Sequence, residues 1–180
     1  MNTVNTSFSP LARLLHWLMA LMILAMLFIG AGMVATVSEK HQWLLAIHKT
    51  LGIAILLLVV VRLVVRLRHR PPPLPMDMPA WQRFVAHASH WLLYALMFAL
   101  PLIGWGMLSA GGYPVMLSHS LRLPAILPAN PVLFAWLREA HRYLAYLFFL
   151  AFLAHMGAAL YHGLVRRDGV LSSMARKGIE

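Results

Sequence analysis

Long apolar runs dominate the chain, and short polar or proline-rich stretches separate them. A helix needs about 20 mainly apolar residues to cross a bilayer. Four segments meet this length, namely residues 11–37, 43–67, 84–110 and 139–165. This pattern predicts an all-α protein with one domain over residues 1–180, an integral membrane four-helix bundle of up-and-down topology.

The composition supports a membrane protein. Apolar residues make up 61% of the chain and charged residues only 11%, whereas a soluble domain is about half apolar and about a quarter charged. These values exclude a disordered chain and an ordinary soluble enzyme. Cysteine is absent, which excludes disulfides, thiolate metal sites, iron–sulfur clusters and covalently attached haem. The first apolar run is longer than the core of a cleaved signal peptide, so we expect a retained span.

The basic residues predict the orientation in the membrane. The net charge is +10, but these charges lie at the ends of the apolar runs, which argues against nucleic acid as a partner. One side of a four-span bundle would carry Arg13, Arg62, Arg66, Arg68, Arg70, Arg83, Arg166, Arg167, Arg176 and Lys177. The other side would carry Lys40, Lys49, Arg122, Arg138 and Arg142. The positive-inside rule therefore places both termini and the proline-rich linker 68–82 in the cytoplasm. The apolar loop 111–138 would face outside, as a lid or a short interfacial helix.

Histidine is unusually frequent, with ten residues against five acidic ones. An ionisable side chain inside a bilayer is costly, so each intramembrane histidine is a functional candidate. Seven lie in or at the expected spans: His16, His48, His87, His90, His141, His155 and His162. We expect His41, His69 and His119 in loops, exposed to solvent or at the interface.

The most informative pair is His141 and His155, which are 14 residues apart on one expected helix. At about 100° and about 1.5 Å per residue, they share one face and lie about 21 Å apart along the axis. His48 lies at the outer depth of this pair and His16 at the inner depth. The sequence therefore favours the pairs His48/His141 and His16/His155, although depth alone also allows His90 with His155.

The ligand types favour haem over a bare metal ion. The spans contain no Asp or Glu except Glu139 at an edge, so mixed-ligand zinc or calcium sites have little support. Two opposed imidazoles suit a six-coordinate haem iron in a bundle core. The alternative is that these histidines are only polar bridges between helices.

Further residues are candidates for a quinone headgroup or for anions. His87, His90 and His162, with Trp17, lie near the inner end and can line a quinone site or simply meet haem propionates or the interface. Arg62 and Arg66 can extend to the membrane surface or neutralise propionates. At the outer end, Lys40, Lys49, Arg122 and Arg142 can attract an anion, although an ordinary mixed loop has the same composition.

Four stretches resemble one known family. They are SPLARLLHW at 9–17, HKTLG at 48–52, AHASH at 86–90, and HRYLAYLFFLAFLAHMGAALYHGLVRRDGVL at 141–171. Together they resemble the bacterial cytochrome b561 family, which is related to cytochrome b subunits of hydrogenases and formate dehydrogenases. The resemblance covers about residues 8 to 174. Some members carry a second His directly after the position of His162, where this chain has Gly163.

The resemblance implies a four-helix bundle with two b-type haems, bound by His16, His48, His141 and His155, and it makes the pairing of His90 less favourable. It also implies a multi-pass protein of the bacterial inner membrane. The family also resembles superoxide oxidases, so we expect an oxidoreductase that oxidises superoxide outside and reduces ubiquinone in the membrane. The alternative is a non-catalytic haem b subunit that serves a dehydrogenase or a periplasmic redox partner. A third possibility is a transporter with histidine proton relays and no haem.

Overall fold

Four long helices form the protein, as the apolar pattern predicts. The structure is a computed structural model that describes residues 7–69, 71–117 and 120–175. Arg70, His119, Arg176 and Lys177 lie outside the described residues. The long helices are α1 (Pro10–Ala35), α2 (Glu39–Arg68), α3 (Ala80–Ala110) and α4 (Pro131–Leu160). A π-helical turn, η1 (Tyr161–Arg166), continues α4, and a short helix, α5 (Val170–Ala175), follows it.

The helices are long and apolar enough to cross a membrane. Their most apolar 18-residue windows have mean hydropathies between 1.8 and 2.5, and only 6% to 28% of each window is buried inside the protein. Most of their apolar side chains therefore face outward, as in helices surrounded by lipid. The chain is an all-α membrane bundle.

Prolines and capping residues set where two helices begin. Ser9 accepts a hydrogen bond from the amide of Ala12 (3.3 Å), and Asn130 accepts one from the amide of Leu133 (3.0 Å). Pro10 and Pro131 follow these caps, because proline fits the first turn of a helix. The fourth helix therefore begins at Pro131, well before the expected boundary at 139.

The outer loop is correspondingly shorter than the expected 111–138, and its described part contains a short hairpin rather than an interfacial helix. Strands β1 (Val115–Met116) and β2 (Arg122–Leu123) pair antiparallel. The rest of the loop packs on the end of α3, where Trp105 donates a hydrogen bond to the carbonyl of Pro124 (2.9 Å).

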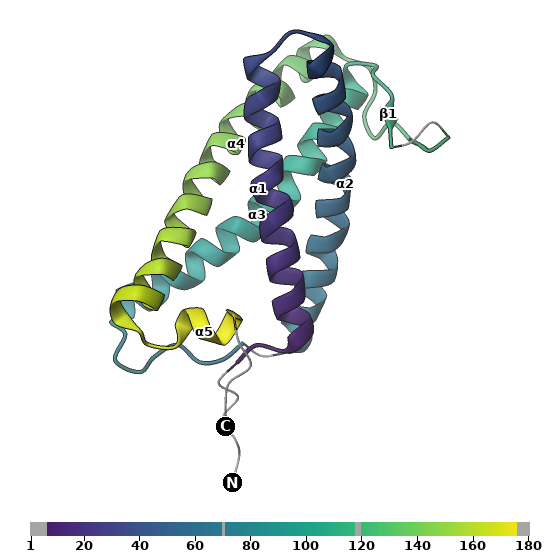
Figure 1. Ribbon diagram of the computed structural model, residues 1–180. Helices are drawn as coiled ribbons and strands as arrows, with labels where there is room; N and C mark the ends of the chain where they lie inside the picture. Colours follow the sequence, from purple (N-terminus) through teal and green to yellow (C-terminus); the bar gives the residue numbers. More distant parts are fainter. Residues whose placement is uncertain (1–6, 70, 118–119, 176–180) are drawn as a thin grey trace.

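The four long helices pack mainly as two pairs, and α2 contacts α3 between them. α1 packs mainly on α2, and α4 packs mainly on α3 (Figure 1). The first described residues and α5 meet at the same end of the bundle, where the amide of Phe8 donates to the carbonyl of Ser173 (3.1 Å). We call this end of the bundle the terminal end and the opposite end, with the hairpin, the hairpin end.

A compact apolar layer fills the middle of the bundle. Its most buried members come from all four helices and include Met19, Val59, Met97 and Phe148. Phe148 lies seven residues from both His141 and His155. The layer therefore separates the depths of these two histidines.

Candidate haem sites

The pair at the hairpin end consists of His48 on α2 and His141 on α4. Their ring centroids are 6.1 Å apart, with an angle of 64° between the ring planes. The Nδ1 atoms of both rings are buried, and neither makes a hydrogen bond of normal geometry within the described residues. Unpartnered buried nitrogen is costly, so these two imidazoles are suited to receive a ligand.

A glycine makes room for this pair. A Cβ atom added at Gly104 would lie 3.3 Å from Cε1 of His141. The imidazole therefore lies close to the bare backbone of α3, and a larger side chain at this position would push it away. The structure brings together the outer pair that the sequence predicts.

The pair at the terminal end consists of His16 on α1 and His155 on α4, with ring centroids 6.3 Å apart. A third ring is also present, because His90 on α3 lies 5.4 Å from His155. Both pairings that depth allowed are therefore close in space.

The ring separations can be compared with the space that a metal needs. With a metal–nitrogen bond of about 2 Å on each side and about 1 Å from nitrogen to ring centre, two rings that share one ion have centroids about 6 Å apart. The pairs His48/His141 and His16/His155 match this value, at 6.1 and 6.3 Å. The pair His90/His155, at 5.4 Å, is tighter.

Each pair offers only two ligands. In the described parts of the chain, no three His, Cys, Asp or Glu side chains converge as a site for a metal ion. Zinc sites use at least three protein ligands. Two opposed imidazoles instead suit an iron that brings its remaining ligands with it, as haem does. The residues present therefore fit haem.

A cavity of about 830 Å³ lies at the terminal end. This volume is within the range of about 300–1,000 Å³ that is usual for ligand and cofactor sites. All three inner rings line it, together with Arg62 and Arg66. Residues 71–75 of the proline-rich linker and the first part of α5 complete its wall.

The two arginines of α2 face this cavity. Arg62 donates to Nδ1 of His16 (2.9 Å) and to the hydroxyl of Tyr94 (3.1 Å). The guanidinium of Arg66 lies 5.5 Å from the ring centre of Tyr94. The interior therefore holds two cations next to the inner histidines, which favours an anionic group there.

The four quinone candidates do not lie together. Trp17 and His90 line the cavity, and the indole of Trp17 donates to the carbonyl of Met174 (3.1 Å). His87 is exposed and is not part of the cavity wall. His162 does not line the cavity, but it contacts Asp168, which does.

Asp168 and Tyr94 are absent from the candidates that the sequence suggests. A usable signal existed for Asp168, because it is the one acidic residue in the basic stretch RRDGVL. Tyr94 resembles any other aromatic residue of an apolar span, and only its contact with Arg62 distinguishes it.

The basic candidates at the hairpin end lie on three different elements. Lys40 and Lys49 are on α2, Arg122 is on β2, and Arg142 is on α4. Arg142 pairs with Glu139 (2.6 Å) and donates to the hydroxyl of Tyr143 (3.0 Å). One of the four charges is therefore partly neutralised.

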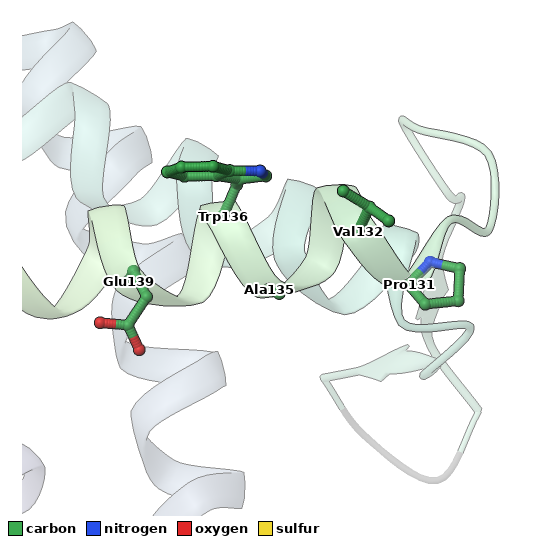
Figure 2. Close-up of a pocket in the computed structure, with 5 residues that line it drawn as sticks. All are labelled: Pro131, Val132, Ala135, Trp136 and Glu139. Carbon is green, nitrogen blue, oxygen red and sulfur yellow. The ribbon is translucent and has the colours of Figure 1, made fainter.

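A second pocket lies apart from the histidines. Figure 2 shows the start of α4, where Pro131, Val132, Ala135, Trp136 and Glu139 line a shallow space of about 460 Å³. The side chains of Trp136 and Val132 point to one side of the helix, and that of Glu139 points away from them. None of these five residues is a histidine, and the pocket does not include either histidine pair.

The fold and these histidine pairs define a class: membrane helical bundles that hold b-type haem between helices and transfer electrons. The comparisons with known proteins agree. The family model "Prokaryotic cytochrome b561" matches residues 7–177, and the chain belongs to this family. It is therefore a multi-pass bacterial membrane protein with haem b cofactors that functions in transmembrane electron transfer.

The relatives cover nearly the whole chain. A "Probable superoxide oxidase CybB" from Yersinia pestis is 30% identical over 97% of this chain and 98% of its own length. "Cytochrome b561 homolog 2" from Escherichia coli (strain K12) is 30% identical over 98% of this chain and 96% of its own length. "Cytochrome b561 homolog 1" from the same strain is 28% identical over 93% of this chain.

Proposed function

We propose that the protein is a dihaem cytochrome b of the bacterial inner membrane. His48 and His141 would hold one haem, and His16 and His155 the other. The observation that supports this most strongly is that α4 carries two imidazoles at two depths, and each has a partner ring at about the separation that a shared metal needs. His90 lies next to the inner pair and remains available for another role.

Haem iron supplies the ability to take up and release single electrons. The protein residues supply orientation, charge and a dry interior. Phe148 and its neighbours keep water out of the layer between the two pairs. Tyr94 orients Arg62 from α3.

Arg62 has to change partner when His16 binds a metal. A guanidinium only donates, so its bond to Nδ1 of His16 leaves the ring proton on Nε2. Neither nitrogen of the neutral ring is then free for a metal. We propose that Arg62, with Arg66 beside it, turns to the propionates of the inner haem.

The proposed substrate at the hairpin end is superoxide. Lys40, Lys49, Arg122 and Arg142 give this end an excess of positive charge, which raises the local concentration of a small anion. The name of the relative from Yersinia pestis supports this choice. In the orientation expected from the basic residues, this end faces the periplasm and both termini face the cytoplasm.

The proposed electron acceptor is ubiquinone in the cavity at the terminal end. His90 and Trp17 lie on its wall and would contact the headgroup. His162 acts there through Asp168, and we leave the exposed His87 out of this site. Two superoxide ions would each give one electron and become O₂, and one quinone would take these two electrons and two protons to form quinol.

The test uses the purified holoprotein in detergent with ubiquinone added. We expect a pulse of superoxide to reduce the haem within the mixing time and ubiquinol to form. In the variant Arg122→Gln with Lys40→Gln, reduction by superoxide should be slower and depend less on salt, whereas reduction by dithionite should not change.

Haem that dithionite reduces but superoxide does not would contradict the proposed substrate. If a second protein then co-purified in a fixed ratio and restored electron transfer, the chain would be an electron-transfer or anchor subunit for a dehydrogenase or a periplasmic redox partner.

A further inference from the structure

Asp168 is an unusual group in the wall of the inner cavity. Among the described residues that line this cavity, it is the only carboxylate. Its side chain is only 10% exposed. It lies after α4 and η1 in the segment that leads to α5, so the chain turns back to place an acid at the terminal end of the cavity.

His162 is the closest partner of this carboxylate. Its Nδ1 lies 2.5 Å from Oδ2 of Asp168, and its side chain is 16% exposed. The amide of Val170 donates to Oδ1 (3.3 Å), and Nε of Arg166 lies 3.4 Å from Oδ2. A carboxylate only accepts hydrogen bonds, so the Nδ1–H of His162 points at Asp168.

The same network reaches the surface. Arg166 also pairs with Asp77 of the linker (2.5 Å), whose side chain is 70% exposed. The exposed fraction of the side chain therefore falls from 70% at Asp77 to 20% at Arg166 and 10% at Asp168. These groups connect the solvent at the terminal end with the cavity.

We propose that Asp168 and His162 form the proton-delivery pair of the inner cavity. This rests on the proposed reduction of quinone there. In its protonated form, His162 gives its Nδ1 proton to Asp168 and becomes a neutral imidazole, and Asp168 passes the proton to an oxygen of the reduced quinone. Two such transfers, with two electrons, form the two O–H bonds of quinol. His162 regains each proton from solvent at the terminal end.

The charges around the pair suit this role. Arg166 and the amide of Val170 face Asp168 from its own segment, and Asp77 faces Arg166 from the linker. The other titratable or charged groups on the cavity wall are His16 of α1, Arg62 and Arg66 of α2, His69 directly after α2, His90 and Tyr94 of α3, and His155 of α4. Burial alone would raise the pKa of Asp168, but the hydrogen bond from His162, the Val170 amide and Arg166 together lower it. Asp168 is then ready to accept a proton and holds it only briefly.

The experiment separates proton delivery from electron transfer. The holoprotein is first reduced with limiting dithionite, so the result does not depend on superoxide. It is then mixed with decylubiquinone, which needs protons, or with ferricyanide, which takes one electron and no proton. Haem reoxidation is followed from about pH 6 to about pH 9, in H₂O and in D₂O.

We expect Asp168→Asn to slow reoxidation by decylubiquinone by about 100-fold, with the largest loss at high pH and a larger solvent isotope effect. Reoxidation by ferricyanide should stay within about twofold of the wild-type rate. Asp168→Glu should restore most of the quinone rate. Glu139→Gln, which removes the carboxylate of another arginine ion pair at the hairpin end, is the matched control and should leave both rates unchanged.

Equal quinone rates in wild type and Asp168→Asn across this pH range would overturn the proposal. Equal losses with both acceptors would also overturn it, because they would show that Asp168 only supports the structure. A wild-type protein that is oxidised by ferricyanide and never by quinone would overturn the proposed acceptor itself. The two failures are therefore distinguishable.

Discussion

His141 and His155 lie on one face of α4, yet the surroundings of the two histidine pairs differ. At the hairpin end, His48 and His141 stand close together, with Gly104 against the second ring. Neither of the two pockets described above is lined by them. At the terminal end, a third ring joins the pair, and a cavity of about 830 Å³ opens next to it.

This difference suggests that the two ends of the bundle have different functions. The outer pair consists of two rings with the backbone of α3 at Gly104 against one of them. The inner pair borders the cavity, whose wall also carries two arginines and one carboxylate. These groups suit a haem and a second molecule that accepts protons. The asymmetry agrees with small-anion chemistry at one end and quinone chemistry at the other, as we propose.

Loss of an outer ligand should produce the largest effect. We expect His141→Leu to lower the haem content from about two to about one per chain, because the outer haem would lose one of its two protein ligands. Pyridine haemochrome analysis measures this directly. His87→Leu, which changes an exposed histidine of α3, should retain both haems. A full complement with the wild-type spectrum in His141→Leu would show that His141 is not a ligand.

The choice of inner ligand can be tested in the same way. His16→Leu should lose the inner haem, whereas His90→Leu should retain it and impair quinone reduction. The reason is the ring separation, which fits a shared metal for His16/His155 better than for His90/His155. If His90→Leu lost the inner haem and His16→Leu retained it, His90 and not His16 would be the partner of His155.

Crowding of the outer pair should have a partial effect. In Gly104→Ala, the new methyl group would lie 3.3 Å from the ring of His141, so the ring must shift. We expect a lower occupancy or a changed spectrum of the outer haem only. Gly30→Ala is the control, because a Cβ there would meet no described atom within 4 Å. Equal spectra of the two variants would show that the close contact between Gly104 and His141 does not affect the outer haem.

Removal of an inner cation should change one reduction potential. A unit charge about 8 Å away contributes about 2 kcal/mol at an effective dielectric constant of about 20, or about 90 mV for one electron. We therefore expect Arg62→Leu to lower the potential of the inner haem by about this amount. A redox titration should show the outer haem unchanged, and a shift of both haems would argue against a local effect.

The smallest effect concerns stability. Because the pKa of Asp168 is lowered in the folded protein, its ion pair stabilises the protein above its unfolded pKa of about 3.9 and loses this contribution as the pH falls through the folded value. Near neutral pH, Asp168→Asn should be less stable by about 1–2 kcal/mol. Melting curves should show the difference disappear in acid, and a constant difference would contradict this assignment.

Helical periodicity explains why much of the site was predictable. The spacing of His141 and His155 defines their relative direction and depth on any straight helix, so the rings that they meet could be inferred before the fold was known. The start of α4 was misplaced because the prediction followed hydropathy, although Asn130 and Pro131 carry an ordinary helix-start signal.

The rest depends on contacts between distant residues. The pairing of Asp77 with Arg166 joins positions 89 residues apart, and no local pattern predicts it. The bond from Arg62 to His16 likewise depends on how α1 packs against α2. The depth of His90 was predictable, but its distance from His155 was not, because depth does not define the separation of two helices.

The central claim is that four histidines hold two haems. The most direct test is a reduced-minus-oxidised spectrum of the purified wild-type protein, with pyridine haemochrome quantification against protein concentration. We predict two haems b per chain when haem supply is not limiting. One haem per chain, or none, would contradict the pairing of His48 with His141 and of His16 with His155.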